Sequence, residues 1–249
     1  MRTIRAAATL AAALALCAGT AGCAPAREGE TSLTVYAAAS LGPALEEIAA
    51  AFEETRPGVD VRPLVLDGSQ VLATQIGEGA PADVFASADE ATMARVAERA
   101  PEPAVFATNT LTIAVPPGNP AGIQGLADLA DPAATVVLCA AEVPCGASSR
   151  ALLEAAGIVV DPASEEQNVG AVLAKVAAGE ADAGLVYRTD IARGGVEEVE
   201  AEGAADVVNR YPIAALRGAD DPEAAAAFVA FVLGDEGQGI LADFGFGAP

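Results

Sequence analysis

Hydrophobic positions along this chain switch repeatedly between the short apolar runs of strands and the three- and four-residue spacing of helices. In residues 33–52 a short apolar run, 33–37, precedes positions that return to one helical face. The pattern predicts a buried strand followed by a helix over 41–55. Ser40 lies at the junction, where we predict that it caps the helix.

A second junction of the same kind follows. The pattern predicts a strand over 59–66, and Ser69 then precedes a helix whose apolar positions include Leu72 and Ile76. Where a buried parallel strand gives way to a helix, free backbone N–H groups and the positive end of the helix dipole point into the crevice above the sheet. One serine there could be only a cap, but two equivalent serines favour an anion site.

The rest of the chain continues this alternation, which favours an α/β fold. Strands are predicted over 84–86, 111–115, 135–139, 183–187 and 207–216, and helices after Asp89, over 147–156, over 169–178, from Asp221-Pro222 and near the end of the chain. The strand over 111–115 opens a second unit. About 226 residues follow the leader, enough for one large domain or for two lobes.

The first residues are typical of a secretion signal. Arg2 and Arg5 precede an apolar run too short to span a bilayer comfortably and small residues that end at Cys23. Residues 20–23 resemble a bacterial lipobox, which implies a signal peptide over 1–22, a lipid on Cys23 and a tether over 23–31. The protein is then expected at the extracytoplasmic face of the cell membrane, attached only by its lipid. Ordinary signal-peptidase cleavage is the alternative.

Composition restricts the chemistry. Removing residues 1–22, which hold two arginines and no acidic residue, takes the formal net charge from -22 to -24. Such a surface repels nucleic acid and acidic membranes, so an anion site would have to work through local neutral dipoles. The chain has no histidine, which excludes Ser-His-Asp and Cys-His catalysis and the commonest metal ligand.

Cysteine usage predicts one disulfide. Cys17 leaves with the signal and Cys23 takes the lipid, so Cys139 and Cys145 are the two that remain. An oxidising exterior should pair them, and the bridge would close a small loop.

With these elements placed, the chain resembles the periplasmic molybdate-binding proteins of ABC transporters. The resemblance rests on TVYAAASL, GSQVLATQIGEGAPADVFASAD, VPCG, GEADAGLVYRTD and YPIAAL. It implies the two-lobed type II periplasmic-binding fold, in which each lobe is a mostly parallel sheet flanked by helices and the ligand lies in the cleft between them. Lobe 1 would comprise 32–110 and 217–249, and lobe 2 would comprise 111–216.

The same resemblance implies a site of neutral donors. Ser40, Ser69 and Tyr187 would donate from their hydroxyl groups, whereas Cys145 and Val169 would donate from their backbone N–H groups. The ligand would be molybdate or tungstate, held as an oxyanion, with no residue coordinating a metal cation directly and no cofactor. The cysteine pair is a departure from the family pattern, because it puts a disulfide into the ligand loop.

The resemblance also implies a function. A monomeric, lipid-anchored receptor would capture the oxyanion and deliver it to an ABC permease and its ATPase. A donor-only site leaves the proton of hydrogen phosphate unpaired and should reject that ion. Two alternatives remain: a receptor for sulfate or another oxyanion, and a secreted hydrolase with Ser40 or Ser69 as nucleophile. The hydrolase would need Lys175, the only lysine, as its base.

Overall fold

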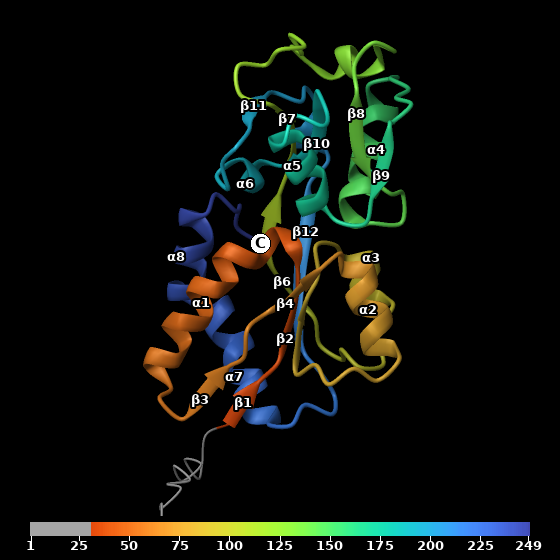
Figure 1. Ribbon diagram of the computed structural model, residues 1–249. Helices are drawn as coiled ribbons and strands as arrows, with labels where there is room; N and C mark the ends of the chain where they lie inside the picture. Colours follow the sequence, from red (N-terminus) through yellow and green to blue (C-terminus); the bar gives the residue numbers. More distant parts are fainter. Residues whose placement is uncertain (1–30) are drawn as a thin grey trace, which may run out of the picture.

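The computed structural model describes residues 31–249 and shows two lobes, each built on a five-stranded sheet (Figure 1). The predictions for the signal peptide, Cys23 and the tether up to residue 30 lie outside the described residues. The predicted two-lobed α/β architecture is confirmed, but each sheet is mixed, with two parallel and two antiparallel strand pairs, and not mostly parallel as predicted. The strands are β1 (Thr31–Leu33), β2 (Val35–Ala38), β3 (Val59–Val61), β4 (Val65–Asp67), β5 (Val84–Ala86), β6 (Ala104–Asn109), β7 (Leu111–Val115), β8 (Val136–Cys139), β9 (Ser164–Glu166), β10 (Ala183–Tyr187), β11 (Glu197–Val199) and β12 (Asn209–Ala215).

The first lobe has the strand order β4-β2-β5-β12-β6. Strands β4, β2 and β5 run parallel, and β12 is antiparallel to both of its neighbours. One face of this sheet carries α1 (Gly42–Thr55), α7 (Pro222–Leu233) and α8 (Asp235–Asp243), and the other carries α2 (Ser69–Gly77) and α3 (Glu90–Ala94) (Figure 1). The period of two explains this division: Val35 and Ala37 pack in one core, whereas Tyr36 packs with Leu72 and Ile76 in the other.

The second lobe has the strand order β11-β7-β10-β8-β9. Strands β10, β8 and β9 are parallel, and β7 and β11 complete the sheet in antiparallel pairs. Its main helices are α4 (Pro144–Ala155) and α5 (Val169–Ala177), with the short α6 (Arg188–Ile191) directly after β10. The carboxyl ends of β8, β9 and β10 therefore lead into loops or helices at one edge, as in other α/β sheets.

The chain crosses between the lobes at the β6–β7 junction and again before β12. Strand β12 pairs with β5 and β6 in the first sheet, so the prediction that residues up to 216 belong to lobe 2 is wrong for this strand. The sequence pattern could not show this, because β12 joins strands far away along the chain.

Three local predictions also need correction. The strand predicted over 59–66 is two strands, because Pro63 lies between them; β3 pairs with β1, whereas β4 pairs with β2. Ser40 does not cap α1: it lies in a 3-10 turn, η1 (Ala39–Leu41), and the N-cap of α1 is Leu41. Helix α4 begins at Pro144, earlier than the predicted residue 147.

The helix caps at two acidic residues are confirmed. The Asp89 carboxylate accepts a hydrogen bond from the Thr92 N–H at 2.7 Å, and the Asp221 carboxylate accepts from Glu223 and Ala224 at the start of α7.

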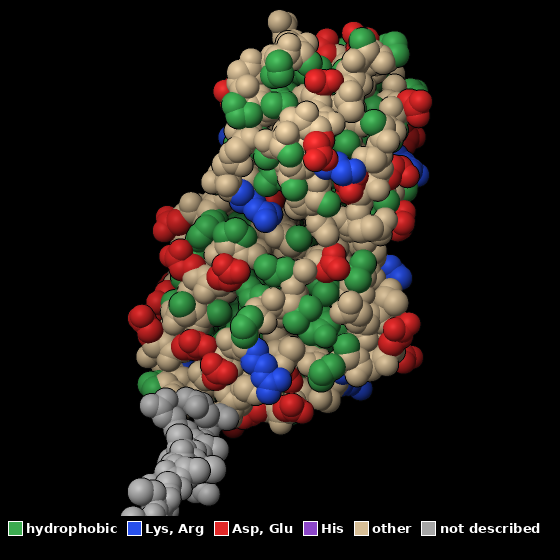
Figure 2. Space-filling model, in the orientation of Figure 1, with side chains coloured by type: hydrophobic (Ala, Val, Ile, Leu, Met, Phe, Trp, Pro, Cys, Tyr) green, Lys and Arg blue, Asp and Glu red, His purple; other side chains and the backbone are tan. Residues whose placement is uncertain are grey.

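The surface is acidic across both lobes. On the face drawn in Figure 2, Asp and Glu side chains are spread over the molecule and Lys and Arg are few. Among the helices of residues 31–249, none by itself combines the length and apolar composition of a membrane span; α7 and α8 reach both only when taken together across their bend.

Candidate anion-binding site

A small pocket lies where the two lobes meet, and it contains all five residues that the sequence predicts as ligands. Its cavity volume is about 10 Å³, room for roughly one water-sized sphere, whereas pockets for drug-sized ligands measure about 300–1,000 Å³. A drug-sized organic solute would therefore not fit into this cavity. The lining residues are Ala38, Ala39, Ser40, Asp67, Gly68, Ser69, Ala88, Val143, Pro144, Cys145, Asn168, Val169 and Tyr187.

The first lobe contributes two serines, each where a strand gives way to helical structure. Ser69 is the first residue of α2, and its Oγ accepts a hydrogen bond from the Ala88 N–H at 3.0 Å. Because Ser69 Oγ acts as the acceptor in this hydrogen bond, its own proton is free for a ligand. Ser40 Oγ lies 3.3 Å from the Tyr211 hydroxyl, and either oxygen can be the donor in that pair.

The second lobe contributes Cys145 from the first turn of α4. Helix α4 starts with Pro144, and its N-terminal N–H groups have no carbonyl partner within the helix. Gly146 follows in a tight fit, because a Cβ added there would lie 1.8 Å from the Ala140 carbonyl oxygen. Only glycine lets the helix start come this close to the end of β8.

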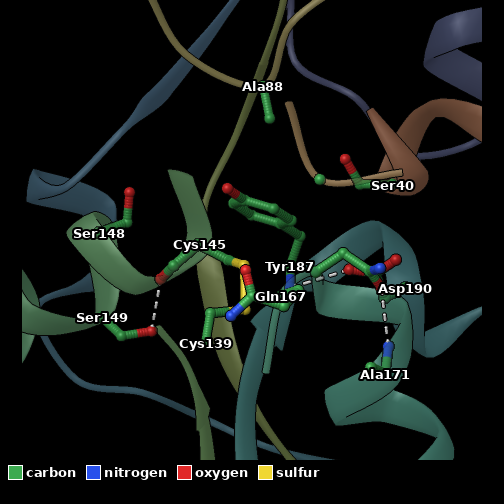
Figure 3. The surroundings of a disulfide bond; sticks show 12 residues. Ser40, Ala88, Cys139, Cys145, Ser148, Ser149, Gln167, Ala171, Tyr187 and Asp190 are labelled. Carbon is green, nitrogen blue, oxygen red and sulfur yellow. Dashed lines mark hydrogen bonds between the residues drawn. A yellow bond between two sulfur atoms is a disulfide. The ribbon is translucent and has the colours of Figure 1, made fainter. Parts of the chain in front are cut away.

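The predicted disulfide between Cys139 and Cys145 is confirmed. It joins the carboxyl end of β8 to the first turn of α4, and Ser149 Oγ donates to the Cys145 carbonyl at 2.7 Å (Figure 3). The bridge therefore fixes the segment whose backbone N–H groups border the pocket.

Val169 opens α5, as predicted, and Asn168 is its N-cap. The Asn168 side chain accepts from the Ala171 N–H and donates to Asp67 Oδ1 in the opposite lobe, each at 3.0 Å. The first N–H groups of α5 are thereby held facing the pocket.

Tyr187 ends β10 and is 1% exposed. Its ring projects into the space bounded by Ser40, Ala88 and Ser148 (Figure 3). Burial, followed by the neighbouring Tyr211, raises the pKa of the Tyr187 hydroxyl well above its usual value of 10. The hydroxyl therefore keeps its proton and can donate it.

Dipoles, and not basic side chains, provide the attraction for an anion in this pocket. Among the described residues that line it, none is Lys or Arg. Instead, the N-termini of α2, α4 and α5 meet at the cavity, and helix N-termini attract anions without a counter-charge. The one carboxylate in the lining, Asp67, accepts from Gly68 N–H and Asn168 Nδ2 through the same oxygen.

Contacts across the pocket join the lobes at its edge. Besides the Asp67–Asn168 hydrogen bond, Gln70 Nε2 donates to the Gln167 carbonyl at 2.9 Å. A Cβ added to Gly68 would lie 2.2 Å from the same carbonyl oxygen. The structure is therefore in a closed arrangement that depends on the bare backbone of Gly68.

Three residues of the site were not predicted from the sequence. In the sequence, Asp67 cannot be told from a turn residue or a solvated carboxylate, whereas Asn168, an asparagine before an apolar helix, has a recognisable cap signal. Asn209, whose side chain contacts Tyr187, begins β12 and has no local sequence signal.

The residue required for a serine hydrolase lies elsewhere. Lys175 is on α5 and bonds to Ser164 and Glu166 at β9, and it does not line the pocket with Ser40 and Ser69. Within residues 31–249, no three His, Cys, Asp or Glu side chains gather as a cation site.

Asp190, beneath the site, leads to a prediction about pH. Its carboxylate is fully buried, accepts from the Tyr187 N–H at 3.1 Å and lies 3.4 Å from the Arg193 guanidinium. Burial, opposed by Arg193, raises its pKa from 3.8 to about 6. Because the folded state then holds this proton more tightly than the unfolded state, this group's contribution to stability is full below pH 4 and is lost as pH rises towards 6.

We expect the loss to be on the order of 2–3 kcal/mol, about two pKa units. Urea unfolding of the wild type and Asp190→Asn at several pH values between 4 and 7 measures it. The wild type should lose stability relative to the variant as pH rises, and a difference that is constant over this range would contradict the prediction.

Comparison with known proteins agrees with the geometry of the site. The family model described as bacterial extracellular solute-binding protein matches residues 33–247. The molybdate-binding protein ModA of Mycobacterium tuberculosis is 45% identical over 227 residues, covering 89% of this chain and 87% of that protein.

Two solved structures share the fold. The periplasmic molybdate-binding protein of Azotobacter vinelandii superposes with a TM-score of 0.73 at 21% identity, covering 87% of this chain and 99% of that one. The sulfate-binding protein SubI of Mycobacterium tuberculosis also superposes with a TM-score of 0.73, at 19% identity, covering 87% and 86%.

The family match identifies a solute-binding protein and not an enzyme. The matched region includes both lobes and all five predicted ligand residues, and the resemblance seen in the sequence is confirmed. This chain belongs to the family of bacterial extracellular solute-binding proteins.

Proposed function

We propose that this protein is the extracytoplasmic receptor for molybdate, and equally for tungstate, of an ABC importer. The observation that carries the proposal is a very small cavity between the contacting lobes, lined by three helix N-termini and three hydroxyl groups, with no basic side chain among the lining residues that the structure describes. The molybdate-binding relative at 45% identity supports the same ligand. Ser40, Ser69 and Tyr187 donate from side chains, and Cys145 and Val169 donate from the backbone.

The binding energy comes from charge-assisted hydrogen bonds. Each is shorter and stronger than a bond between neutral groups, and a buried dianion can accept several at once. Neutral donors suit this acidic protein, because they hold the ligand without a basic patch. A basic patch would also be occupied by other anions.

Selectivity follows from the direction of the donors. Molybdate and tungstate carry no proton near neutral pH, whereas phosphate carries at least one. Ser69 Oγ and Tyr187 Oη each already accept one hydrogen bond from the protein, so each hydroxyl has its proton available to donate to the ligand. A phosphate O–H directed at these donors would be buried without a partner, which costs about 1–3 kcal/mol or more, and among the described residues of the lining Asp67 is the only carboxylate that could accept it.

Calorimetric titration of residues 31–249 with molybdate, tungstate, sulfate and phosphate tests the proposal. We expect similar, tight binding of molybdate and tungstate, and phosphate at least a hundredfold weaker, from about 3 kcal/mol for an unpaired O–H near the charged ligand. Sulfate is the competing ligand, because a sulfate-binding protein has the same fold. Sulfate binding as tight as molybdate binding would reassign the receptor to the broader oxyanion class.

Delivery and anchoring complete the proposal. Receptors of this class present their closed, loaded form to a permease, and its ATPase drives uptake; a monomer suffices for this.

We expect Cys23→Ser to release the protein from the membrane fraction and to leave its anion affinity unchanged, since the folded lobes start beyond the tether. Fractionation of cells that express each form measures this, and equal partitioning of the variant with membranes would show that Cys23 carries no anchor.

A further inference from the structure

Asn209 joins both lobes at the pocket, although it is not one of its predicted ligands. It is the first residue of β12 and is 4% exposed. Its Oδ1 accepts from Ser148 Oγ at 2.7 Å, and its Nδ2 donates to the Ala88 carbonyl at 3.2 Å and to the Tyr187 hydroxyl at 2.9 Å. One side chain thus contacts α4, the end of β10 and the loop that follows β5.

The partners fix which way the amide faces. The Ala88 carbonyl can only accept, so the NH₂ group of Asn209 must face it, and Tyr187 lies on this same side. The Ser148 hydroxyl then serves as the donor to Oδ1. A flipped amide would place two acceptor oxygens, Oδ1 and the Ala88 carbonyl, against each other.

This orientation determines what Tyr187 can do. A phenol has one proton to donate, and here its oxygen accepts from Asn209. The proton therefore points away from Asn209, and Tyr187 lines the same cavity as Ser40 and Ser69. Ala88 reinforces the arrangement from the other side, because its N–H donates to Ser69 and its carbonyl accepts from Asn209.

We propose that Asn209 is a positioning and specificity-determining residue: it fixes the Tyr187 hydroxyl as a donor and so biases the pocket towards oxyanions without a proton. The inference rests on the proposed oxyanion-receptor function. Without the amide, the phenol could turn its lone pairs to the ligand and accept from a protonated oxyanion, which would weaken the discrimination against phosphate.

A double-mutant cycle tests it, with molybdate and phosphate as probes in calorimetry. Asn209→Leu keeps the size of the side chain and removes the amide donor; Asn209→Ser, too short to reach the hydroxyl, is the second variant if the first does not fold. We expect either variant to lower molybdate affinity about tenfold. This is roughly the effect of losing one hydrogen bond to a group that itself binds the charged ligand. Phosphate affinity should rise, so the molybdate-to-phosphate affinity ratio should fall by more than the loss in molybdate affinity alone.

The same substitution in a Tyr187→Phe background should change molybdate affinity by less than about twofold, because its effect passes through the hydroxyl. Ser148→Ala is the matched control: it removes the hydrogen bond that Asn209 Oδ1 accepts and spares those that Nδ2 donates to Ala88 and Tyr187, so its affinity should equal the wild type's. An equal effect of the Asn209 change in both backgrounds, or a Ser148→Ala loss as large as that of Asn209→Leu, would overturn the inference and leave Asn209 as a tie between elements.

The wild-type titration separates this inference from the proposed function. If the wild type binds sulfate instead of molybdate, the proposed ligand is wrong, and the cycle is run with sulfate on the same residues. If the wild type binds molybdate and the cycle shows no coupling, the proposed function stands and the role of Asn209 fails.

Discussion

Gly68→Ala is expected to lower the affinity for molybdate at least a hundredfold. Gly68 belongs to the first lobe, and a Cβ there would lie 2.2 Å from the Gln167 carbonyl oxygen of the second lobe. The methyl group would hold the lobes apart and move Cys145, Val169 and Tyr187 away from the two serines. Loss of even two charge-assisted hydrogen bonds, at about 1.5–3 kcal/mol each, gives this factor.

The variant should fold normally, because the backbone angles of Gly68, φ -60° and ψ 133°, suit alanine. Gly77→Ala is the matched control: it lies at the other end of α2, and a Cβ there meets nothing within 4 Å. It should keep full affinity and gain up to about 1 kcal/mol of stability. Calorimetry and thermal unfolding of both variants measure these effects, and wild-type affinity in Gly68→Ala would show that binding does not require this closed arrangement.

Removing any one side-chain donor is expected to lower molybdate affinity ten- to a hundredfold. A hydrogen bond to a charged group is worth about 1.5–3 kcal/mol, and Ser40→Ala, Ser69→Ala and Tyr187→Phe each delete one. Wild-type affinity in all three variants would assign the whole site to backbone donors.

Stability separates the three variants. Ser69→Ala leaves the buried Ala88 N–H without its acceptor and should cost about 1–3 kcal/mol of unfolding free energy. Ser40 does not cap α1, so Ser40→Ala should cost less. Tyr36→Phe is a matched control for Tyr187→Phe, because Tyr36 packs with Leu72 and Ile76 outside the pocket; its affinity should be unchanged.

The sequence predicted the elements that local pattern determines. The junctions that carry Ser69 and Val169 follow from apolar spacing and from the strands before them, and the disulfide follows from export and cysteine count. Short strands such as β9 and β11 were missed because three residues carry too little periodic signal. The 59–66 segment was misassigned because its apolar residues outweighed Pro63.

The interlobe features could not have been predicted in this way. Asn209 reaches Tyr187 and Ala88 only because β12 returns to the first sheet, and the contact of Gly68 with Gln167 exists only when the lobes close. The Asn209–Ala88 and Gly68–Gln167 contacts each join residues about a hundred positions apart, and no period along the chain encodes such a pair.

A crystal structure with molybdate, with the metal located by its anomalous scattering, tests the central claim most directly. We predict one ion at the cavity between the lobes, its oxygens about 2.7–3.1 Å from Ser40 Oγ, Ser69 Oγ, Tyr187 Oη and the backbone nitrogens of Cys145 and Val169, with no Lys or Arg in contact. An ion held elsewhere, or held here by a basic side chain, would contradict the account of an oxyanion bound by neutral donors alone.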